Sequence, residues 1–231
     1  MLQHVRGPEP IRLNYVTSPQ YERMTKDLFL GTFLDRFPLV EHQYSHYTGY
    51  FRDGFSQAIL FKLDRIIESL ELHPRSISVW SDVDIIFFRP VEPYIRGCLS
   101  RVDLAISPEH DWGWHINSGF LAARGTKANI EMFREVRRLC YDHGLPGEQG
   151  LIDQFLMSGR VPWCIFPKTF RNTTMPNQLP PDSVFFHANN VCEAGVNMGF
   201  KVNESLPHRA RKEALLRAVR LEFKVGHSLV F

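Results

Sequence analysis

Two carboxylates inside an apolar run are the residues best suited to do chemistry in this sequence. Asp82 and Asp84 stand two positions apart in the segment Val79–Phe88, which otherwise holds Val, Trp, Ile, Phe and a single Ser. Such a run is typical of a strand buried on both faces of a sheet, where an unpaired charge has a high desolvation cost. Two carboxylates where a strand gives way to a turn can both reach one hard cation and its bound phosphates. The alternative is a polar turn between core strands, but the Gly, Asn and Pro that such turns favour are missing.

Other polar residues stand at places that suit a phosphate- and sugar-binding site. Lys62 lies beside the apolar face of an expected helix, from which it could extend toward Asp82; a surface lysine is the alternative. The segment 112–120 offers two indoles, an imidazole and an amide, from Trp112, Trp114, His115 and Asn117. Aromatic faces stack on sugar C–H surfaces, and polar side chains orient the hydroxyls. The segment therefore predicts a carbohydrate contact or, as structure alone, an aromatic-filled loop.

Two later segments supply further candidates. Asp153 and Gln154 fall in a short expected helix, where adjacent side chains diverge by about 100°, so at most one faces a site squarely. His187 ends the apolar run that begins at Val184. It is a candidate third protein ligand, because imidazole together with carboxylates suits Mn²⁺ and similar ions. A histidine held only by hydrogen bonds is the alternative.

Alternating strands and helices must position these residues. Apolar runs predict strands at 11–16, 38–44, 77–81, 104–107, 118–123, 163–166 and 184–187. Helices are expected from an N-cap at Ser18 to Arg36, from Gly54 through Leu70, from a cap at Thr126 to before Gly144, and over 147–157 and 206–223. This order predicts an α/β fold with a mostly parallel central sheet and helices on both faces. Ligands of such sheets bind beyond the carboxyl ends of the strands, where Asp82 and Asp84 would lie.

Length and composition are those of a globular protein. The chain has 231 residues, of which 44% are hydrophobic and 23% charged, and it can bury a sizeable core. A net charge of +2 provides no case for nucleic acid binding. The 18 phenylalanines predict an aromatic-rich core or a stacking site.

Several features bear on where the protein works. No apolar run approaches the roughly 20 residues that span a bilayer, and the first residues are too polar for a signal peptide. Cys98, Cys140, Cys164 and Cys192 lack the close spacing of a zinc site, which favours free thiols. We therefore expect a cytoplasmic protein. The basic C-terminal helix carries Arg209, Arg211, Lys212, Arg217 and Arg220. A peripheral contact with an anionic membrane or a partner is one interpretation, and a solvated face is the other.

Taken in order, five segments resemble the nucleotide-diphospho-sugar transferases of the GT-A fold. They are Lys62, Ser81–Asp84, Asn117–Phe120, Asp153–Gln154 and His187–Asn189. The sequence is most similar to the group related to glycosyltransferase family 77, and more distantly to family 8. The resemblance covers about residues 11–201. It implies a single GT-A domain over 1–231, with a basic helix and tail at 202–231.

The resemblance implies a role for each candidate. Asp84, His187 and Asp82 would hold Mn²⁺ (or Mg²⁺) on the diphosphate of a nucleotide sugar, with Asp82 on the ribose as the alternative. Asp153 and Gln154 would flank the anomeric carbon as the catalytic pair. The donor would be bound by Tyr15, Thr17, Lys62, Asp82, Asn117, Ser118 and Gly119, and the acceptor by Trp112, Trp114 and His115. In family 8 a lysine closely follows the histidine, whereas Lys201 follows His187 at a longer interval.

The implied activity is metal-dependent transfer of a hexosyl or pentosyl group to a hydroxyl acceptor, with retention of anomeric configuration. The nucleotide base and the acceptor, a carbohydrate or another hydroxyl compound, are not identified. One alternative is a phosphatase of the haloacid dehalogenase type, but Ile86 stands where that class needs Thr or Val, and no adjacent acidic pair follows Asp84. A non-catalytic sugar-binding module on the same fold is the other alternative.

Overall fold

A six-stranded sheet forms the centre of the computed structural model, which describes residues 8–44, 54–110, 115–143, 147–172, 179–189 and 208–228. Its strand order is β2 (Leu39–Gln43), β1 (Ile11–Thr17), β3 (Ile77–Ser81), β6 (Ile116–Arg124), β5 (Leu104–Pro108) and β7 (Trp163–Ile165). Three of the five pairings are parallel, and β6 runs antiparallel to both neighbours. The expected α/β fold with a mostly parallel sheet is thereby confirmed.

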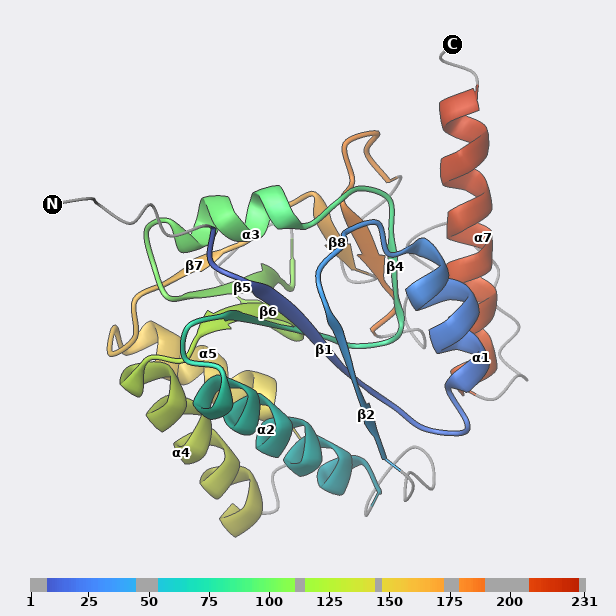
Figure 1. The fold of residues 1–231 in the computed structure, drawn as a ribbon. Helices are drawn as coiled ribbons and strands as arrows, with labels where there is room; N and C mark the ends of the chain where they lie inside the picture. The colour runs from blue at the N-terminus through green and yellow to red at the C-terminus, as the bar shows by residue number, and fades with distance from the viewer. Residues whose placement is uncertain are drawn as a thin grey trace, which may run out of the picture.

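A second, three-stranded sheet lies beside the first (Figure 1). It consists of β4 (Ile85–Phe87), β9 (Phe185–His187) and β8 (Phe170–Asn172), in that order. Sequence reasoning did not separate β4 from β3, because the apolar run is continuous apart from Ser81 and the two aspartates. The chain leaves the first sheet after Ser81 and enters the second at Ile85, so both carboxylates lie in the turn between two sheets.

Helices cover both faces of the central sheet (Figure 1). On one face lie α2 (Gly54–Leu72), α4 (Lys127–His143) and α5 (Glu148–Met157); on the other lie α3 (Glu92–Leu99), the small sheet and α7 (His208–Ser228). Because side chains alternate along a strand, neighbours in one strand join different cores. Val79 and Phe120 belong to the cluster on the second face, whereas Trp80 and Leu121 pack with α2 and α4.

The segment after β1 departs from the expected long helix. The helical residues are α1 (Glu22–Met24), a π-helical turn at Thr25–Phe29 and a 3₁₀ turn at Leu30–Thr32. Tyr21 occupies the N-cap position of α1, and the Ser18 hydroxyl has no hydrogen-bond partner among the described residues. The N-cap prediction for Ser18 was therefore wrong: Ser18 makes a turn in which its carbonyl accepts the Tyr21 N–H at 2.8 Å. The other cap is confirmed, since the Thr126 hydroxyl accepts the Asn129 N–H at 3.3 Å.

Phenylalanines fill the core between the two sheets. Phe120 has ring centroids of Phe185, Phe166 and Phe170 at 5.0, 5.7 and 5.7 Å, and all four rings are buried. The Phe166 and Phe170 rings stack at 4.5 Å with planes only 3° apart. Such pairs contribute about 0.5–1.5 kcal/mol each beyond their burial. For these residues, the prediction of an aromatic-rich core is confirmed.

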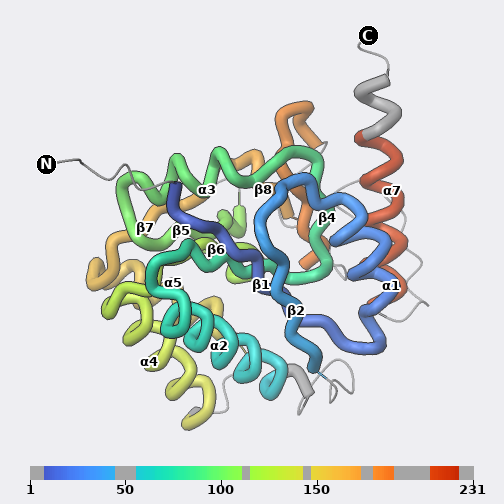
Figure 2. Tube along the Cα trace, viewed as in Figure 1, coloured from blue at the N-terminus to red at the C-terminus, as the bar shows by residue number. Residues whose placement is uncertain are grey.

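The C-terminal helix α7 packs on the body of the protein. Leu215, Leu216 and Val219 are buried in the same core as the phenylalanines. Figures 1 and 2 show α7 running beside the segment that follows β1. Three of its basic residues contact that segment: Arg209 donates to the Gln20 carbonyl at 2.5 Å, Arg220 to the Asp27 carbonyl at 3.3 Å, and Arg217 pairs with the Asp27 carboxylate at 3.5 Å. A membrane contact of this helix stays a prediction.

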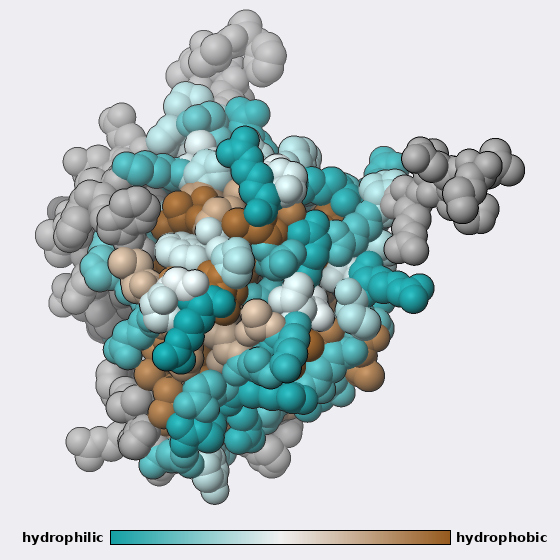
Figure 3. All heavy atoms as spheres, turned by 90° about the vertical axis from the view of Figure 1, so that its left-hand side faces the viewer, coloured by the Kyte–Doolittle hydropathy of each residue, from teal (hydrophilic) through white to brown (hydrophobic). Residues whose placement is uncertain are grey.

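The surface, the helices and the thiols of the described residues can each be compared with what the sequence predicts. The face turned to the viewer in Figure 3 is mostly hydrophilic, with apolar residues showing between polar ones. No described helix combines the length and the apolar character needed to cross a membrane. Cys98, Cys140 and Cys164 are free thiols, as expected, and Cys192 lies outside the described residues.

Candidate functional site

A cavity of about 380 Å³ opens where β1 and β3 end and β6 begins. Because β6 is antiparallel, its first residues meet the last residues of β3, which brings residues 117–119 beside residues 82–84. Helix α5 begins and α7 passes at the same edge. The polar lining residues are Thr17, Ser18, Tyr21, Tyr44, Lys62, Asp82, Asp84, Glu109, Asn117, Ser118, Glu148, Gln149, His187, Asn189 and Lys212.

Asp82, Asp84 and His187 form a group that could hold a metal ion. One ligand atom from each lies within 4.8 Å of the others. His187 Nε2 is 3.1 Å from Asp84 Oδ1 and 3.9 Å from Asp82 Oδ2. The pairing of β4 with β9, which sets Ile85 opposite His187, creates this proximity. The predicted three-residue site is therefore brought together by the fold, with Asp84 and His187 buried and Asp82 more open.

The orientation of His187 follows from its hydrogen bonds. Asn117 Nδ2 donates to Glu109 Oε2 at 2.6 Å, which fixes the direction of the Asn117 amide. Asn117 Oδ1 accepts the Gly119 N–H at 2.9 Å and lies 3.1 Å from His187 Nδ1, so Nδ1 must donate. Nε2 lies 3.1 Å from Asp84 Oδ1: when Nε2 carries a proton it donates to that carboxylate, and when it does not, its lone pair is available to a cation held by the two aspartates. Metal-binding histidines are commonly oriented in this way, by a hydrogen bond from the ring nitrogen that does not bind the metal. The arrangement therefore fits a cation between His187 and the two aspartates.

Gly119 provides the space that this arrangement needs. A Cβ on residue 119 would lie 2.2 Å from His187 Cε1 and 2.8 Å from Asn117 Oδ1. The Gly119 carbonyl also accepts the Asp82 N–H at 2.7 Å, which holds the aspartate turn against β6. Gly119 also lines the cavity, and its predicted contact with the nucleotide-sugar donor stays a prediction.

Lys62 is fully engaged inside the site. Its Nζ lies 3.0 Å from Asp82 Oδ1, 3.0 Å from the Ser118 carbonyl oxygen and 3.2 Å from Glu148 Oε1. These three acceptors use all three N–H donors of the ammonium group. Burial alone would lower the pKa of Lys62, but the charges of Asp82 and Glu148 outweigh it and raise the pKa above its ordinary value. Lys62 therefore holds Asp82 in position. The sequence predicted that Lys62 could extend toward Asp82, and the two side chains do meet.

Ser118 is also held by its neighbours. Its hydroxyl donates to Glu148 Oε1 at 2.9 Å, and its backbone N–H donates to Gln149 Oε1 at 3.2 Å. Together with the carbonyl that accepts from Lys62, every polar group of Ser118 is used within the protein. Ser118 thus links the start of α5 to the start of β6.

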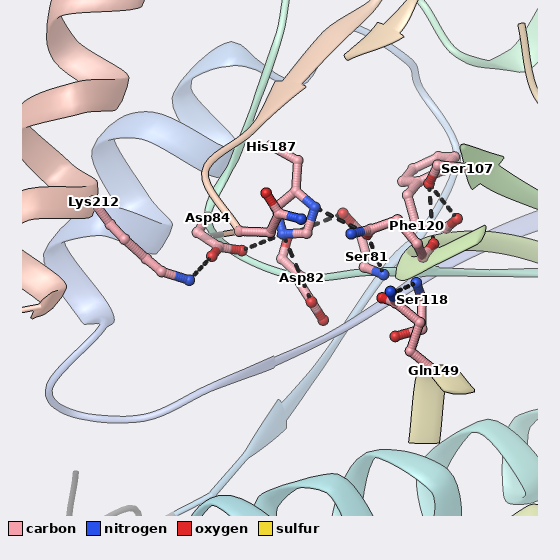
Figure 4. Close-up of polar contacts among 12 residues, drawn as sticks. Ser81, Asp82, Asp84, Ser107, Ser118, Phe120, Gln149, His187 and Lys212 are labelled. Carbon is pink, nitrogen blue, oxygen red and sulfur yellow. Dashed lines mark hydrogen bonds and ion pairs between the residues drawn. The ribbon is translucent and has the colours of Figure 1, made fainter. Parts of the chain in front are cut away.

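The two aspartates differ in their electrostatic surroundings. Burial acts to raise the pKa of Asp84, but the Lys212 ammonium and His187 outweigh it and hold the pKa below its usual range. Burial and the neighbouring Asp84 charge raise the pKa of Asp82, against the opposing effect of Lys62. Lys212 forms an ion pair with Asp84 Oδ2 from α7, while His187 approaches Asp84 from a different side (Figure 4).

Several predicted residues lie away from the cavity. Tyr15 is buried on β1 and donates from its hydroxyl to Glu41 at 3.0 Å, so its side chain serves strand pairing, while Thr17 lines the cavity. Asp153 and Gln154 are not in the lining; Asp153 contacts the exposed His115 at 3.2 Å. The first turn of α5 carries the residues that reach the cavity, and residues five positions later project elsewhere. Trp112, Trp114 and Lys201 lie outside the described residues.

Sequence reasoning missed several residues that the fold brings to the site, and four of them make the polar contacts described above. These four are Glu109, Glu148, Gln149 and Lys212. Glu148 and Gln149 stand at the start of the helix expected over 147–157, in which Asp153 and Gln154 were the candidates. Their position at the N-terminus of that helix could have identified them. No local signal distinguishes Lys212 from the other basic residues of its helix.

Comparison with known proteins shows the fold. The sequence matches no protein-family model and no curated protein. The structure is similar to that of a glycosyltransferase involved in the glycosylation of the major capsid of PBCV-1, with a TM-score of 0.60 and 16% identity over 90% of this chain and 99% of that one. The glycosyltransferase GlyE of Streptococcus pneumoniae TIGR4 aligns with a TM-score of 0.48 and 14% identity over 70% of this chain and 46% of that one, so this chain spans under half of its length. The first likeness establishes a glycosyltransferase-like fold.

Proposed function

We propose that this protein is a metal-dependent glycosyltransferase that moves a hexosyl or pentosyl group from a nucleoside-diphosphate sugar to a hydroxyl acceptor. One observation carries the proposal: Asp82, Asp84 and His187 converge in a cavity at the strand ends of a glycosyltransferase-like fold. The finer assignments, namely retention and the group related to glycosyltransferase family 77, rest on the sequence resemblance.

The residues present fit a divalent cation. Two carboxylates and one imidazole with its lone pair directed inward form a donor set that suits Mn²⁺ better than Mg²⁺, which favours oxygen ligands. A bound cation would neutralise the negative charge that develops on a departing nucleoside diphosphate. The protein's part is to keep these groups oriented: Lys62 holds Asp82, and Glu109 through Asn117 holds His187.

The groups that would stabilise the sugar in the transition state are assigned to the start of α5. The transition state of glycosyl transfer resembles an oxocarbenium ion, which nearby carboxylate or amide oxygens stabilise. Glu148 and Gln149 line the cavity, whereas Asp153 and Gln154 do not. We therefore place this role with Glu148 and Gln149 in preference to the pair expected from the resemblance. We place the acceptor on the side of His115, whose side chain is outside the lining but whose carbonyl accepts the N–H of the lining residue Glu109 at 2.8 Å.

The two alternative functions receive less support. A phosphatase of the haloacid dehalogenase type would use an acidic pair as further metal ligands, whereas the third group here is a histidine. A non-catalytic sugar-binding module would not need a buried imidazole oriented by two further side chains. Turnover separates this last alternative from an enzyme.

The test is release of nucleoside diphosphate from a panel of nucleotide sugars, with water or simple sugars as acceptors. We expect release by the wild type in Mn²⁺ and none after chelation. Asp84→Asn keeps the shape of the side chain but removes a charged ligand. It should reduce turnover by more than the roughly 10- to 100-fold typical of outer partners of metal ligands.

The control is the fold of the variant. Asp84→Asn should keep the far-UV circular dichroism of the wild type, because the substitution leaves no cavity. Metal-independent release, or equal release by wild type and variant, would contradict the proposal. Nucleotide binding without release from any donor would favour the non-catalytic module. The anomeric configuration of the product, read by NMR, tests retention.

A further inference from the structure

Lys212 is a basic residue whose position the proposed function does not yet explain. Its Nζ forms an ion pair with Asp84 Oδ2, and its side chain is 13% exposed. It reaches the cavity from α7, 128 residues away in the sequence (Figure 4). On the same helix Arg209, Arg217 and Arg220 contact residues 20–27 instead. Lys212 therefore belongs to the site, whereas these three arginines dock the helix.

The charges around the cavity give this lysine a specific place. Four carboxylates line the cavity, from Asp82, Asp84, Glu109 and Glu148, and the lysines among the lining residues are Lys62 and Lys212. A diphosphate brought to this surface would meet strong repulsion without cations. Lys62 cannot help without losing a contact to Asp82, Ser118 or Glu148, which use its three donors.

The contact with Asp84 sets Lys212 against a metal ion. A divalent cation bound to Asp84 would share that carboxylate with an ammonium group, and like charges at such distances repel strongly in a buried site. A metal ion alone therefore binds against this repulsion, even where it uses Asp84 Oδ1 and leaves Oδ2 to Lys212. When phosphate oxygens arrive with the metal, they offer the ammonium a new charge-assisted partner beside its old one.

We propose that Lys212 is a diphosphate-binding residue of this site and that its pairing with Asp84 opposes the binding of the metal alone. The inference rests on the proposed function, because it takes the ligand to be a nucleoside diphosphate with a divalent cation. Its consequence is a pair of effects with opposite signs. Lys212 weakens the binding of the metal alone and strengthens the binding of the diphosphate in the presence of the metal.

The experiment uses Lys212→Met, which keeps an unbranched side chain and removes the charge. Isothermal titration calorimetry measures Mn²⁺ alone, and then inorganic pyrophosphate at saturating Mn²⁺, a probe that does not depend on the nucleotide base. Coupling between two ligands is typically about 5- to 150-fold. We expect the variant to bind Mn²⁺ alone at least about fivefold more tightly, and pyrophosphate at least about fivefold more weakly, than the wild type.

The matched control is Arg220→Met, on the same helix but bonded to the Asp27 carbonyl outside the cavity lining. It should bind both probes as the wild type does. Lys212→Gln, a second neutral variant, should repeat the two opposite changes and serves if Lys212→Met does not fold. Changes of the same sign in both measurements, or no change, overturn the inference alone. Failure of the wild type to bind either probe removes the proposed function and this inference with it.

Discussion

A hydrogen atom in place of a side chain at Gly119 allows His187 to take its position in the site. Gly119 lies against the edge of the His187 ring and the Asn117 amide, closer than any Cβ could approach. The amide and the ring in turn form the chain of hydrogen bonds from Glu109 that presents Nε2 to the aspartates. At the scale of residues, the site thus depends on side chains that need not touch a ligand at all.

Gly119→Ala tests this dependence. The added methyl must push the imidazole or the amide aside, so we expect Mn²⁺ affinity to fall by roughly 10- to 100-fold. The free energy of unfolding should fall by about 1–3 kcal/mol, as for other overpacked sites. Calorimetric metal titration and urea unfolding measure the two effects.

Gly150→Ala is the control for that substitution. A Cβ at residue 150 of α5 would meet nothing within 4 Å. Metal affinity should be unchanged and stability unchanged or raised by up to about 1 kcal/mol, because alanine favours a helix. Wild-type metal affinity in Gly119→Ala would show that the imidazole does not need this space.

At the scale of elements, the helix α7 determines more than its place at the end of the chain suggests. It buries three apolar residues in the core that also holds β4 and β9, the strands that flank Asp84 and deliver His187. It also carries Lys212 into the cavity. The packing of α7 and the assembly of the site should therefore be linked.

Leu216→Ala measures how firmly α7 belongs to the core. Leu216 is fully buried, and its truncation should lower the free energy of unfolding by about 2–5 kcal/mol. On the same helix Leu221 is 65% exposed, so Leu221→Ala should change stability by no more than about 0.5 kcal/mol. Equal, small effects in urea unfolding would mean that α7 does not pack on the core in solution.

The pairing of β1 with β2 leads to a prediction about alkaline pH. Burial, together with the hydrogen bond to Glu41, raises the pKa of Tyr15 to about 12. The unfolded value is about 10, so the folded protein holds this proton more tightly. The resulting stability is fully present below about pH 10 and is lost as the pH rises toward 12.

The free energy of unfolding of Tyr15→Phe should therefore approach that of the wild type as the pH rises. We expect the wild type to be the more stable protein at pH 8, and the difference in unfolding free energy to narrow by about 1 kcal/mol at pH 11. Tyr141→Phe, at a residue 67% exposed, should stay within about 0.5 kcal/mol of the wild type at both pH values. A constant difference for Tyr15→Phe would contradict the raised pKa.

At the scale of the whole molecule, the central sheet separates two apolar cores and has a charged cavity at the ends of its strands. The cavity holds more carboxylates than lysines, and Asp84 lies beside His187, which could share a cation with it. Ligand binding should therefore add stability to the entire fold, since the ligand groups come from both sheets and from helices on both faces.

Thermal unfolding detects that stabilisation. A metal and a nucleoside diphosphate together, at 100 times the dissociation constant, should add about 2.7 kcal/mol. The midpoint should return to the ligand-free value after chelation, and Asp84→Asn should show little rise. No shift with any common nucleoside diphosphate in Mn²⁺ would contradict the proposed donor.

The sequence by itself determined the features that depend on local pattern. Apolar runs and helical periodicity located most strands and helices, and the carboxylates in the run at Val79–Phe88 identified the centre of the site. His187 could be added to the candidate metal ligands because it ends the apolar run that begins at Val184. These inferences hold because burial imposes a regular spacing of apolar residues on each helix and strand. That spacing can be recognised without knowing which elements pack against one another.

Only the tertiary structure decided which distant residues meet. The antiparallel direction of β6 brings Gly119 to His187, and the docking of α7 brings Lys212 to Asp84. The first turn of α5, and not Asp153, faces the cavity. No local pattern contains this information. The residue that compensates a buried charge, or that leaves space for a side chain, is the one that the fold places beside it, and that residue can be far away in the sequence.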